Sequence, residues 1–264
     1  MTSRSSWDSP PQNVDVSWES FDPAAYVDHN YRCLHAEDAE ILRFVRDHFA
    51  DHFRVGPSGP VSGIDVGAGP NLYPALAMLP WCDEITLLDR SPANVRYLER
   101  QLPSYDAAWD QFWEVLCEHQ AYRSLGSDPR ERFRRIAVAR QGDLFDLARY
   151  PGRWTMGTMF FVAESMTGRH AEFQAGVEHF MCALAPGAPF AAAFMAHSRG
   201  YSVGGNFFPA CDVGESDVWA SLEEFAQDFK IVRLTSSAAI RAGYSGIVLA
   251  CGWRRQGDAV PPGP

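Results

Sequence analysis

The sequence predicts an α/β protein with a doubly wound, mostly parallel sheet. Apolar runs of strand length alternate with stretches of helical length along most of the chain, and this order produces parallel strands joined by helical crossovers. Early in this alternation, an apolar run that ends in Asp65 is followed by a glycine-rich turn, residues 67–70. A helical segment and a second apolar run that ends in Asp89 come next. Strand, glycine turn, helix, strand and acid in this order form half of a nucleotide-binding α/β unit.

The expected elements can be placed in chain order. Residues 1–17 are rich in Ser, Pro and Asp and are expected to form a disordered tail. A helix is expected from Pro23, which Asp22 can cap, and another over 36–53, where apolar residues have helical spacing. Further helices are expected at 73–79, from Pro92, which Ser91 can cap, at 130–139, at 170–184 and at 217–229. Strands are expected at 62–65, 84–88, 156–163, 189–195, 231–234 and 246–253.

The pattern indicates one domain over 18–255, with an N-terminal lid at 18–55 and a loose tail at 256–264. An aromatic stretch at 105–122 is longer than a minimal crossover needs. The glycine-rich loop that follows the strand at 189–195 is expected to be mobile.

Each part of the glycine turn has a physical role. Gly67 and Gly69 lack Cβ, so the turn can adopt unusual φ/ψ angles and the backbone can approach a ligand closely. Asp89 lies at the end of the second strand, where a carboxylate can accept both hydroxyls of a ribose.

Other residues of the turn argue against a dinucleotide. Pro70 has no N–H to donate, and Leu72 occupies the third glycine position, so the pyrophosphate cradle is incomplete. Asp65 would repel a pyrophosphate and suits a ligand with a cationic amine. S-adenosylmethionine has a ribose and an α-amino group and lacks phosphate, so it is the favoured ligand; the alternative is an ordinary strand–helix turn without a ligand.

Two tyrosines and three later residues are further candidates. Tyr26 and Tyr31 either pack in the core or belong to a lid whose aromatic faces suit a sulfonium cation. Asp143 either accepts a hydrogen bond from an adenine amino group or caps a helix. Glu164 follows a buried strand and His197 the next one, and parallel strands place their carboxyl ends at one edge of a sheet.

Composition argues against several classes of function. The net charge of −10 disfavours nucleic acid, whose phosphates require a basic surface. The first residues lack an apolar signal-peptide core, and no uncharged apolar run is long enough to span a bilayer. Six widely spaced cysteines without a C-x-x-C motif indicate reduced thiols in a cytoplasmic protein and no metal site.

Several motifs together resemble the small-molecule methyltransferase family that comprises nicotinamide, phenylethanolamine and thioether methyltransferases. The resemblance covers about residues 21–254. It rests on F-D-P-A-A-Y-V-D-H-N-Y, I-D-V-G-A-G-P-N-L-Y, L-L-D-R-S-P-A-N, the aromatic insert near Trp109, F-F-V-A-E, L-A-P-G and G-I-V-L-A. It implies a class I methyltransferase fold, which is Rossmann-like, with an antiparallel final strand and an N-terminal helical lid.

The resemblance also implies roles for individual residues. Tyr26 and Tyr31 would close on the cofactor, and Gly67 and Tyr73 would line its methionine end. The remaining cofactor contacts would come from Asp89 and Asn94 at the ribose and adenine, from Asp143 and Leu144 at the adenine, and from Phe160 after the fourth strand. Glu164 matches an acid that reaches the substrate amine in the phenylethanolamine branch. The nicotinamide enzymes carry an Asp where this sequence has Ala196 and His197, which argues against nicotinamide as the acceptor.

The sequence thus predicts an S-adenosylmethionine-dependent methyltransferase that acts on a small molecule, with an amine nitrogen as acceptor. Glu164 is favoured over His197 as the residue that orients the amine. Two alternatives remain open: intramolecular cyclisation of the cofactor to a cyclic amino acid and methylthioadenosine, and a non-catalytic cofactor- or partner-binding protein. The chain is expected to be a monomer or homodimer.

Overall fold

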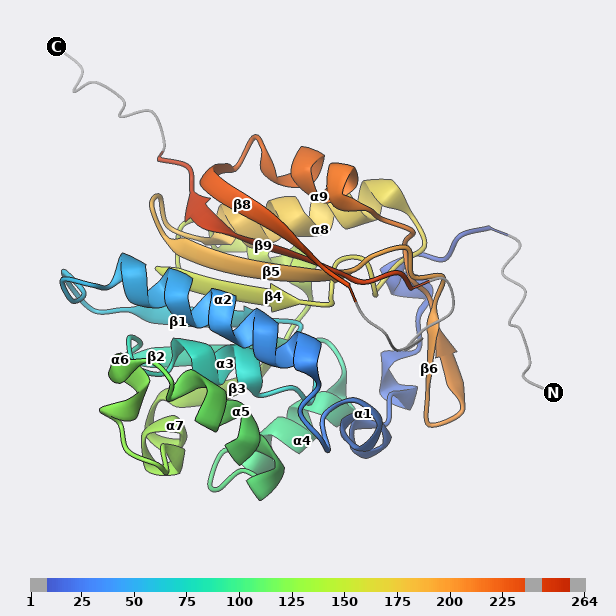
Figure 1. The fold of residues 1–264 in the computed structure, drawn as a ribbon. Helices are drawn as coiled ribbons and strands as arrows, with labels where there is room; N and C mark the ends of the chain where they lie inside the picture. Colours follow the sequence, from blue (N-terminus) through green and yellow to red (C-terminus); the bar gives the residue numbers. More distant parts are fainter. Residues whose placement is uncertain (1–8, 236–243, 257–264) are drawn as a thin grey trace, which may run out of the picture.

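The computed structural model describes residues 9–235 and 244–256, and its centre is a seven-stranded sheet with helices on both faces (Figure 1). The strand order is β3-β2-β1-β4-β5-β9-β8. The strands are β1 (Ser62–Val66), β2 (Glu84–Asp89), β3 (Ala137–Gln141), β4 (Met156–Phe160), β5 (Pro189–Met195), β8 (Ala226–Leu234) and β9 (Ile247–Arg254). This arrangement confirms the predicted α/β class.

Strand direction locates the place where a ligand binds. β1 to β5 run parallel, whereas β9 runs antiparallel to both of its neighbours, as predicted for the final strand. The chain order of the strands reverses at β1, with β2 and β3 on one side and β4 on the other. In open α/β sheets, ligands bind beyond the carboxyl ends of the strands at such a reversal.

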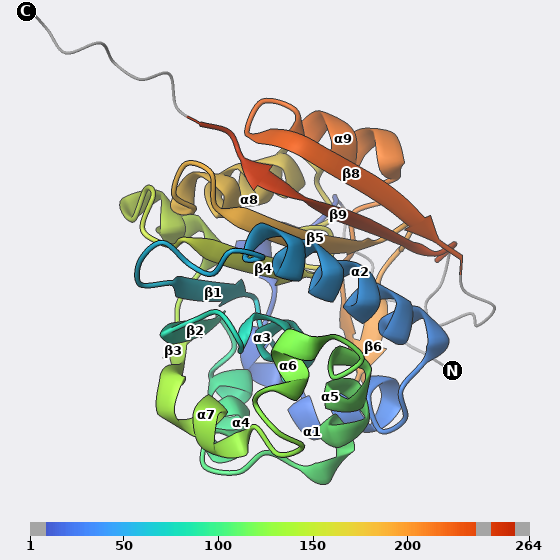
Figure 2. The same ribbon diagram turned by 60° about the vertical axis from the view of Figure 1, so that its left-hand side comes forward.

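The helices form two layers, which Figure 2 shows above and below the sheet. One layer contains α2 (Ala36–His52), α3 (Tyr73–Met78), α4 (Pro92–Gln101), η3 (Ala107–Trp109), α5 (Asp110–Leu116), α6 (Gln120–Arg123) and α7 (Arg130–Ile136). The other contains η4 (Leu144–Arg149), α8 (His170–Ala183) and α9 (Glu215–Leu222). Each layer buries its own apolar core against the sheet, so the strands read as near-continuous apolar runs.

Two helix starts follow directly from local sequence. α1 (Pro23–Asn30) begins where the Asp22 carboxylate accepts a hydrogen bond from the Ala25 amide at 3.0 Å. α4 begins in the same way, with the Ser91 hydroxyl accepting from the Asn94 amide at 3.3 Å. Both helices carry proline in their first turn, where its missing N–H costs nothing. Both predicted caps are confirmed.

The expected disordered tail is wrong for residues 9–17, which are folded against the sheet layers. Here η1 (Asn13–Asp15) buries Asn13, and the amide of Asn13 donates to Glu172 on α8 at 3.0 Å. The Pro11 carbonyl accepts from the Gly168 amide at 2.8 Å. Composition suggested disorder because these polar residues bury little apolar area; hydrogen bonds to distant residues hold the segment instead. Residues 1–8 and, of the expected loose tail, 257–264 lie outside the described residues.

Two predicted helices are too long because strands begin inside them. The helix expected at 130–139 ends at Ile136, and Ala137 starts β3, which pairs in parallel with β2. The helix expected at 217–229 ends at Leu222, and Ala226 starts β8, which pairs with β9. In both cases pairing with a neighbouring strand overrides a short local helical pattern.

The loop expected after β5 forms a hairpin. It consists of β6 (Tyr201–Val203) and β7 (Asn206–Phe208). Phe208 packs with Phe21 at a ring-centroid distance of 5.3 Å and with Trp18 of η2 (Trp18–Ser20) at 5.5 Å. The hairpin therefore supports the N-terminal segment at the carboxyl end of the sheet, where Figure 1 shows β6 beside the blue N-terminal helices.

A histidine between α2 and β9 should make stability depend on pH. Burial lowers the pKa of His48 to about 4 from its usual 6.5. The unfolded chain therefore binds more protons between these values, so the free energy of unfolding falls as the pH falls through this window. We expect His48→Gln to remove that contribution, which amounts to about 1–2 kcal/mol between pH 7 and pH 5 for this partly buried site.

Urea denaturation of both proteins at pH 7 and pH 5 measures this effect. The buried carboxyls of Asp38 and Asp65 have raised pKa values, which change the free energy of unfolding with pH in the opposite direction. Both proteins contain these carboxyls, so the difference in pH dependence between variant and parent reports on His48 alone. His170→Gln, at an exposed position, serves as the control. A His48→Gln protein whose stability changes with pH as the parent's does would refute the assignment.

Candidate functional site

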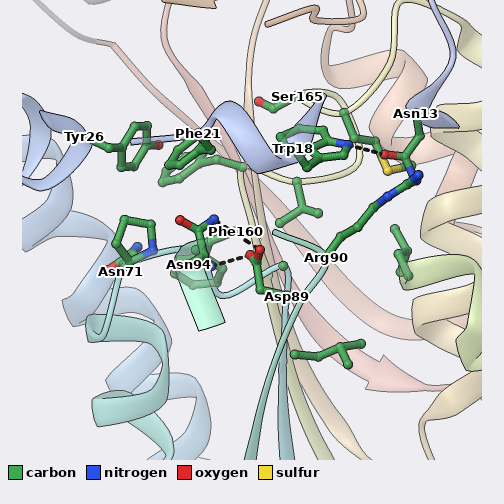
Figure 3. Close-up of a pocket in the computed structure, with 18 of the residues that line it drawn as sticks. Asn13, Trp18, Phe21, Tyr26, Asn71, Asp89, Arg90, Asn94, Phe160 and Ser165 are labelled. Carbon is green, nitrogen blue, oxygen red and sulfur yellow. Dashed lines mark hydrogen bonds between the residues drawn. The ribbon is translucent and has the colours of Figure 1, made fainter. Parts of the chain in front are cut away.

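A large cavity opens at the carboxyl ends of β1, β2 and β4, beneath the N-terminal segment (Figure 3). It holds about 750 Å³ of space, including its open mouth. Most of the predicted cofactor residues line it: Tyr26, Tyr31, Gly67, Gly69, Asp89, Asn94, Asp143, Leu144 and Phe160. These residues come from segments far apart in sequence, so the fold has gathered them at one place.

The glycine turn after β1 forms part of the cavity wall. Gly67 has φ +63° and Gly69 has φ +58°, both in the left-handed region. A Cβ at Gly67 would lie 2.5 Å from a methyl carbon of Val162, which also lines the cavity. Glycine is therefore required here both for the backbone angle and for space.

Asp89 is held at the cavity wall by three nitrogen donors. Its Oδ2 accepts from the Gly69 amide at 2.8 Å, and its Oδ1 accepts from the Ser91 amide at 2.8 Å and from the Asn94 side chain at 3.1 Å. Burial raises the pKa of Asp89, while these three donors act to lower it. The result is a fixed, nearly buried carboxyl whose exposed edge can accept hydrogen bonds from ligand hydroxyls.

A second acid, Asp143, lies farther along the same cavity. Its carboxylate accepts from the Phe145 amide at 2.9 Å, which confirms the capping role at η4, and from Arg90 Nη1 at 2.7 Å. The Asn13 side-chain nitrogen lies 3.3 Å from Asp143 Oδ2, and Asn13 Oδ1 accepts from the Trp18 indole at 2.8 Å. Asp143 thus caps a helix, lines the cavity and anchors the N-terminal segment at once.

Aromatic side chains of the N-terminal segment close one side of the cavity. Phe21 and Tyr26 have ring centroids 5.2 Å apart, and Tyr26 and Tyr31 have centroids 5.8 Å apart. Figure 3 shows Trp18, Phe21 and Tyr26 along one side, with Asn71, Asn94 and Asp89 across from them. The cavity thus has an aromatic side and a polar side.

Two predicted cofactor residues lie behind the cavity wall. Asp65 is buried; its Oδ1 accepts from the Thr158 hydroxyl at 2.7 Å, and burial raises its pKa to about 8. Within the described residues, Asp65 Oδ2 has no hydrogen-bond partner. Tyr73 packs edge-on against Phe160 at 5.7 Å and supports it from behind.

The structure brings neither predicted catalytic residue to the cavity wall. Glu164 is fully buried, and its Oε1 accepts from the Ser165 hydroxyl at 2.9 Å and from the Met195 amide at 3.0 Å. It therefore joins the loop after β4 to the end of β5. His197, at φ +58°, lies at the surface with its side chain half exposed and Nδ1 2.8 Å from Asp212.

Several cavity residues escaped the sequence analysis. Asn13 and Trp18 fall in or beside the segment expected to be disordered, where a lone tryptophan and its polar neighbours gave no periodic signal. Arg90 directly follows Asp89, and Ser165 directly follows Glu164, so both were adjacent to predicted residues. Their side chains reach the cavity through tertiary packing, which no local pattern encodes.

Two further features are absent from the described residues. In residues 9–235 and 244–256, no group of three His, Cys, Asp or Glu side chains is placed to hold a metal ion. No helix in this part of the chain is long and apolar enough to cross a bilayer.

Two curated relatives match part of the chain. An indolethylamine N-methyltransferase from Mus musculus is 27% identical over 125 residues, which are 46% of this chain and 47% of the relative. A phenylethanolamine N-methyltransferase from Bos taurus is 27% identical over 197 residues, which are 66% of each chain. The match thus spans about half of one relative and just under two thirds of the other.

Solved structures show the same fold at low identity. The N-methyltransferase NodS from Bradyrhizobium japonicum, in complex with S-adenosylhomocysteine, has a TM-score of 0.50 at 12% identity, covering 89% of this chain and 93% of that one. A geranyl diphosphate methyltransferase in complex with S-adenosylmethionine has a TM-score of 0.51 at 12% identity, covering 82% and 85%. This likeness establishes the class I methyltransferase fold.

The profile of the NNMT/PNMT/TEMT family matches residues 12–250, almost the whole described chain. The glycine turn, the fixed carboxyl of Asp89 and the aromatic wall are all arranged around one cavity of the fold that uses S-adenosylmethionine. The chain therefore belongs to the NNMT/PNMT/TEMT family of S-adenosylmethionine-dependent methyltransferases.

Proposed function

We propose that this protein binds S-adenosylmethionine in the cavity at the carboxyl ends of β1, β2 and β4 and transfers its methyl group to the nitrogen of a small amine. The observation that carries the proposal is the Asp89 carboxyl, fixed by three donors at a cavity wall opposite a set of aromatic rings. The carboxyl can accept hydrogen bonds from the ribose hydroxyls, and aromatic faces attract a sulfonium cation.

Different lining residues would hold different parts of the cofactor. Asp89 would accept the ribose hydroxyls, and Asp143 and Leu144 lie where the adenine would be held. Gly67 and Gly69 leave room for close approach of the backbone. When bound, S-adenosylmethionine supplies an electrophilic methyl group on a positively charged sulfur.

The unpaired oxygen of Asp65 supports this cofactor in particular. A buried carboxyl oxygen without a partner is costly unless a ligand or water satisfies it. Asp65 lies two residues before Gly67, behind the part of the wall where the methionine end would lie. A cationic α-amino group near this position would offset its burial, directly or through water, whereas a phosphate would not.

Catalysis would come mainly from positioning and from exclusion of water. A neutral amine has a free electron pair and needs no strong base once it is placed in line with the methyl group. The rings of Phe21, Tyr26 and Tyr31 cover the cavity and keep water from the reacting atoms. The names of the two curated relatives suggest an amine on a short arm attached to an aromatic ring.

A product assay tests the proposal. The purified protein is incubated with S-adenosylmethionine and either indolethylamine or phenylethanolamine, and mass spectrometry quantifies the products. We expect adenosylhomocysteine and the N-methylated amine in equal amounts. A reaction without acceptor is run in parallel; methylthioadenosine in that sample would mean cyclisation of the cofactor and would overturn methyl transfer. Tight cofactor binding with no product from any amine would favour a non-catalytic role.

A further inference from the structure

A second cavity adjoins the first and shares part of its wall. Tyr26, Tyr31 and Phe161 line both cavities. The second cavity holds about 810 Å³, including its open mouth, and its apolar lining continues with Met195 at the end of β5 and Ile247 at the start of β9. The side chains of Tyr26, Tyr31 and Phe161 therefore form the boundary between the two cavities.

One wall of this second cavity carries a buried acid. Asp38 lies in the first turn of α2, is 8% exposed and lines the cavity. Its Oδ1 accepts a hydrogen bond from the Tyr73 hydroxyl at 3.2 Å. In the described part of the chain, no Lys, Arg or His forms an ion pair with Asp38, so the Tyr73 hydroxyl and the N-terminus of α2 are the groups that offset its charge there.

A buried carboxyl without an ion-pair partner contributes little to folding stability, but it can bind a cation. Burial raises the pKa of Asp38 to about 7, because removal from water disfavours the charged form. A cation bound beside it would restore the charge and supply the missing partner. The rest of the lining is divided between apolar side chains and polar ones, with Glu37 as a second carboxyl and His29 and His35 as imidazoles. The fitting ligand is therefore an ammonium group on a body with an apolar face.

We infer that the second cavity is the acceptor site and that Asp38 anchors the acceptor's ammonium group, which selects protonated amines over neutral molecules of the same shape. This inference rests on the proposed function, since it names the acceptor that the cofactor cavity would serve. It replaces Glu164 as the amine anchor, because Glu164 is fully buried and lines neither cavity.

A chain of contacts links the anchor to the shared wall. The hydroxyl of Tyr73 holds Asp38, and the Tyr73 ring lies 5.9 Å from the ring of Tyr31, which belongs to both cavities. An amine at Asp38 would therefore lie close to the boundary that the methyl group must cross. Before attack, one N–H bond of the ammonium breaks and an O–H bond forms on the Asp38 carboxylate, which leaves a free electron pair on nitrogen.

The test is a binding measurement on the whole chain, saturated with adenosylhomocysteine. Two probes are titrated by calorimetry: phenylethanolamine and the diol in which a hydroxyl replaces its amine. The parent is expected to bind the amine more tightly than the diol. Asp38→Asn keeps an oxygen for the Tyr73 hydroxyl and removes the charge, so it should weaken amine binding by at least about tenfold and leave diol binding within about twofold.

Glu40→Gln removes one negative charge from an exposed position on the same helix and is the matched control. The inference is overturned if the parent binds neither probe, if Asp38→Asn weakens both probes equally, or if Glu164→Gln rather than Asp38→Asn abolishes the preference for the amine. Selective, Asp38-dependent amine binding without any methylated product would leave the ammonium site at Asp38 intact but refute the proposed transfer reaction, and with it the role of this cavity as an acceptor site.

Discussion

Replacement of Asp89 by asparagine is expected to raise the dissociation constant for adenosylhomocysteine about a hundredfold, because it removes the charged acceptor of the ribose hydroxyls. The effect should be large because the carboxyl is fixed in advance by Gly69, Ser91 and Asn94. An asparagine side chain would also turn its NH₂ group toward at least one of these donors, so the side chain cannot keep the same orientation. Calorimetric titration of both proteins measures the change.

Asp146→Asn is the control for this experiment. Asp146 carries the same charge on η4, pairs with Arg149 at the surface and does not line the cavity. Thermal unfolding of each variant without ligand separates a loss of affinity from a loss of folding. A change of less than about threefold in a folded Asp89→Asn protein would show that the ribose does not bind at this carboxyl.

Truncation of residues 1–17 should weaken cofactor binding by at least about tenfold, mainly through faster dissociation. The truncation removes Asn13, which donates to Asp143 and Glu172 and accepts from Trp18. Without that anchor, Trp18 and Phe21 keep their packing on Phe208 of the hairpin but lose the link through Asn13 to Asp143 and α8. Release of adenosylhomocysteine, followed after mixing with an excess of S-adenosylmethionine, gives the dissociation rate.

A shorter truncation tests whether the contacts or merely the chain length matter. Removal of residues 1–8 leaves every described contact of the segment in place, so it should not change the dissociation rate. If both truncated proteins and the full chain release adenosylhomocysteine at the same rate, residues 9–17 play no part in binding. A single Asn13→Ala substitution should reproduce most of the effect of the longer truncation.

Many of the residues that line the first cavity could be predicted from the sequence, because the patterns that identify them are local. Positive φ at Gly67 and Gly69 is set within a single turn, and the acid at the end of β2 lies two residues before the cap at Ser91, so each signal is contained in a short window. Parallel strands then bring their carboxyl ends to one edge, which placed Asp143 nearby, whereas Phe160 was implied by the family resemblance.

The acceptor half was not readable in the same way. Glu164 follows β4 as predicted, yet its carboxyl turns into the interior and accepts from the Met195 amide of the neighbouring strand. Asp38 looked like an ordinary acid in the first turn of a helix, and only the packing of α2 beside Tyr73 buries it at a cavity. The direction and burial of a side chain depend on neighbours that are distant in sequence.

The sequence by itself determined the α/β class, the glycine turn, the helix caps and the acid at the end of β2, because these depend on backbone angles and hydrophobic runs within short windows. Only the tertiary structure decided that β3 and β8 begin inside apparent helices and that residues 9–17 fold. Asn13 and Glu172, for example, are 159 residues apart, and their hydrogen bond exists only once α8 has packed on the sheet. Contacts of this kind depend on long-range packing, so no local sequence pattern can predict them.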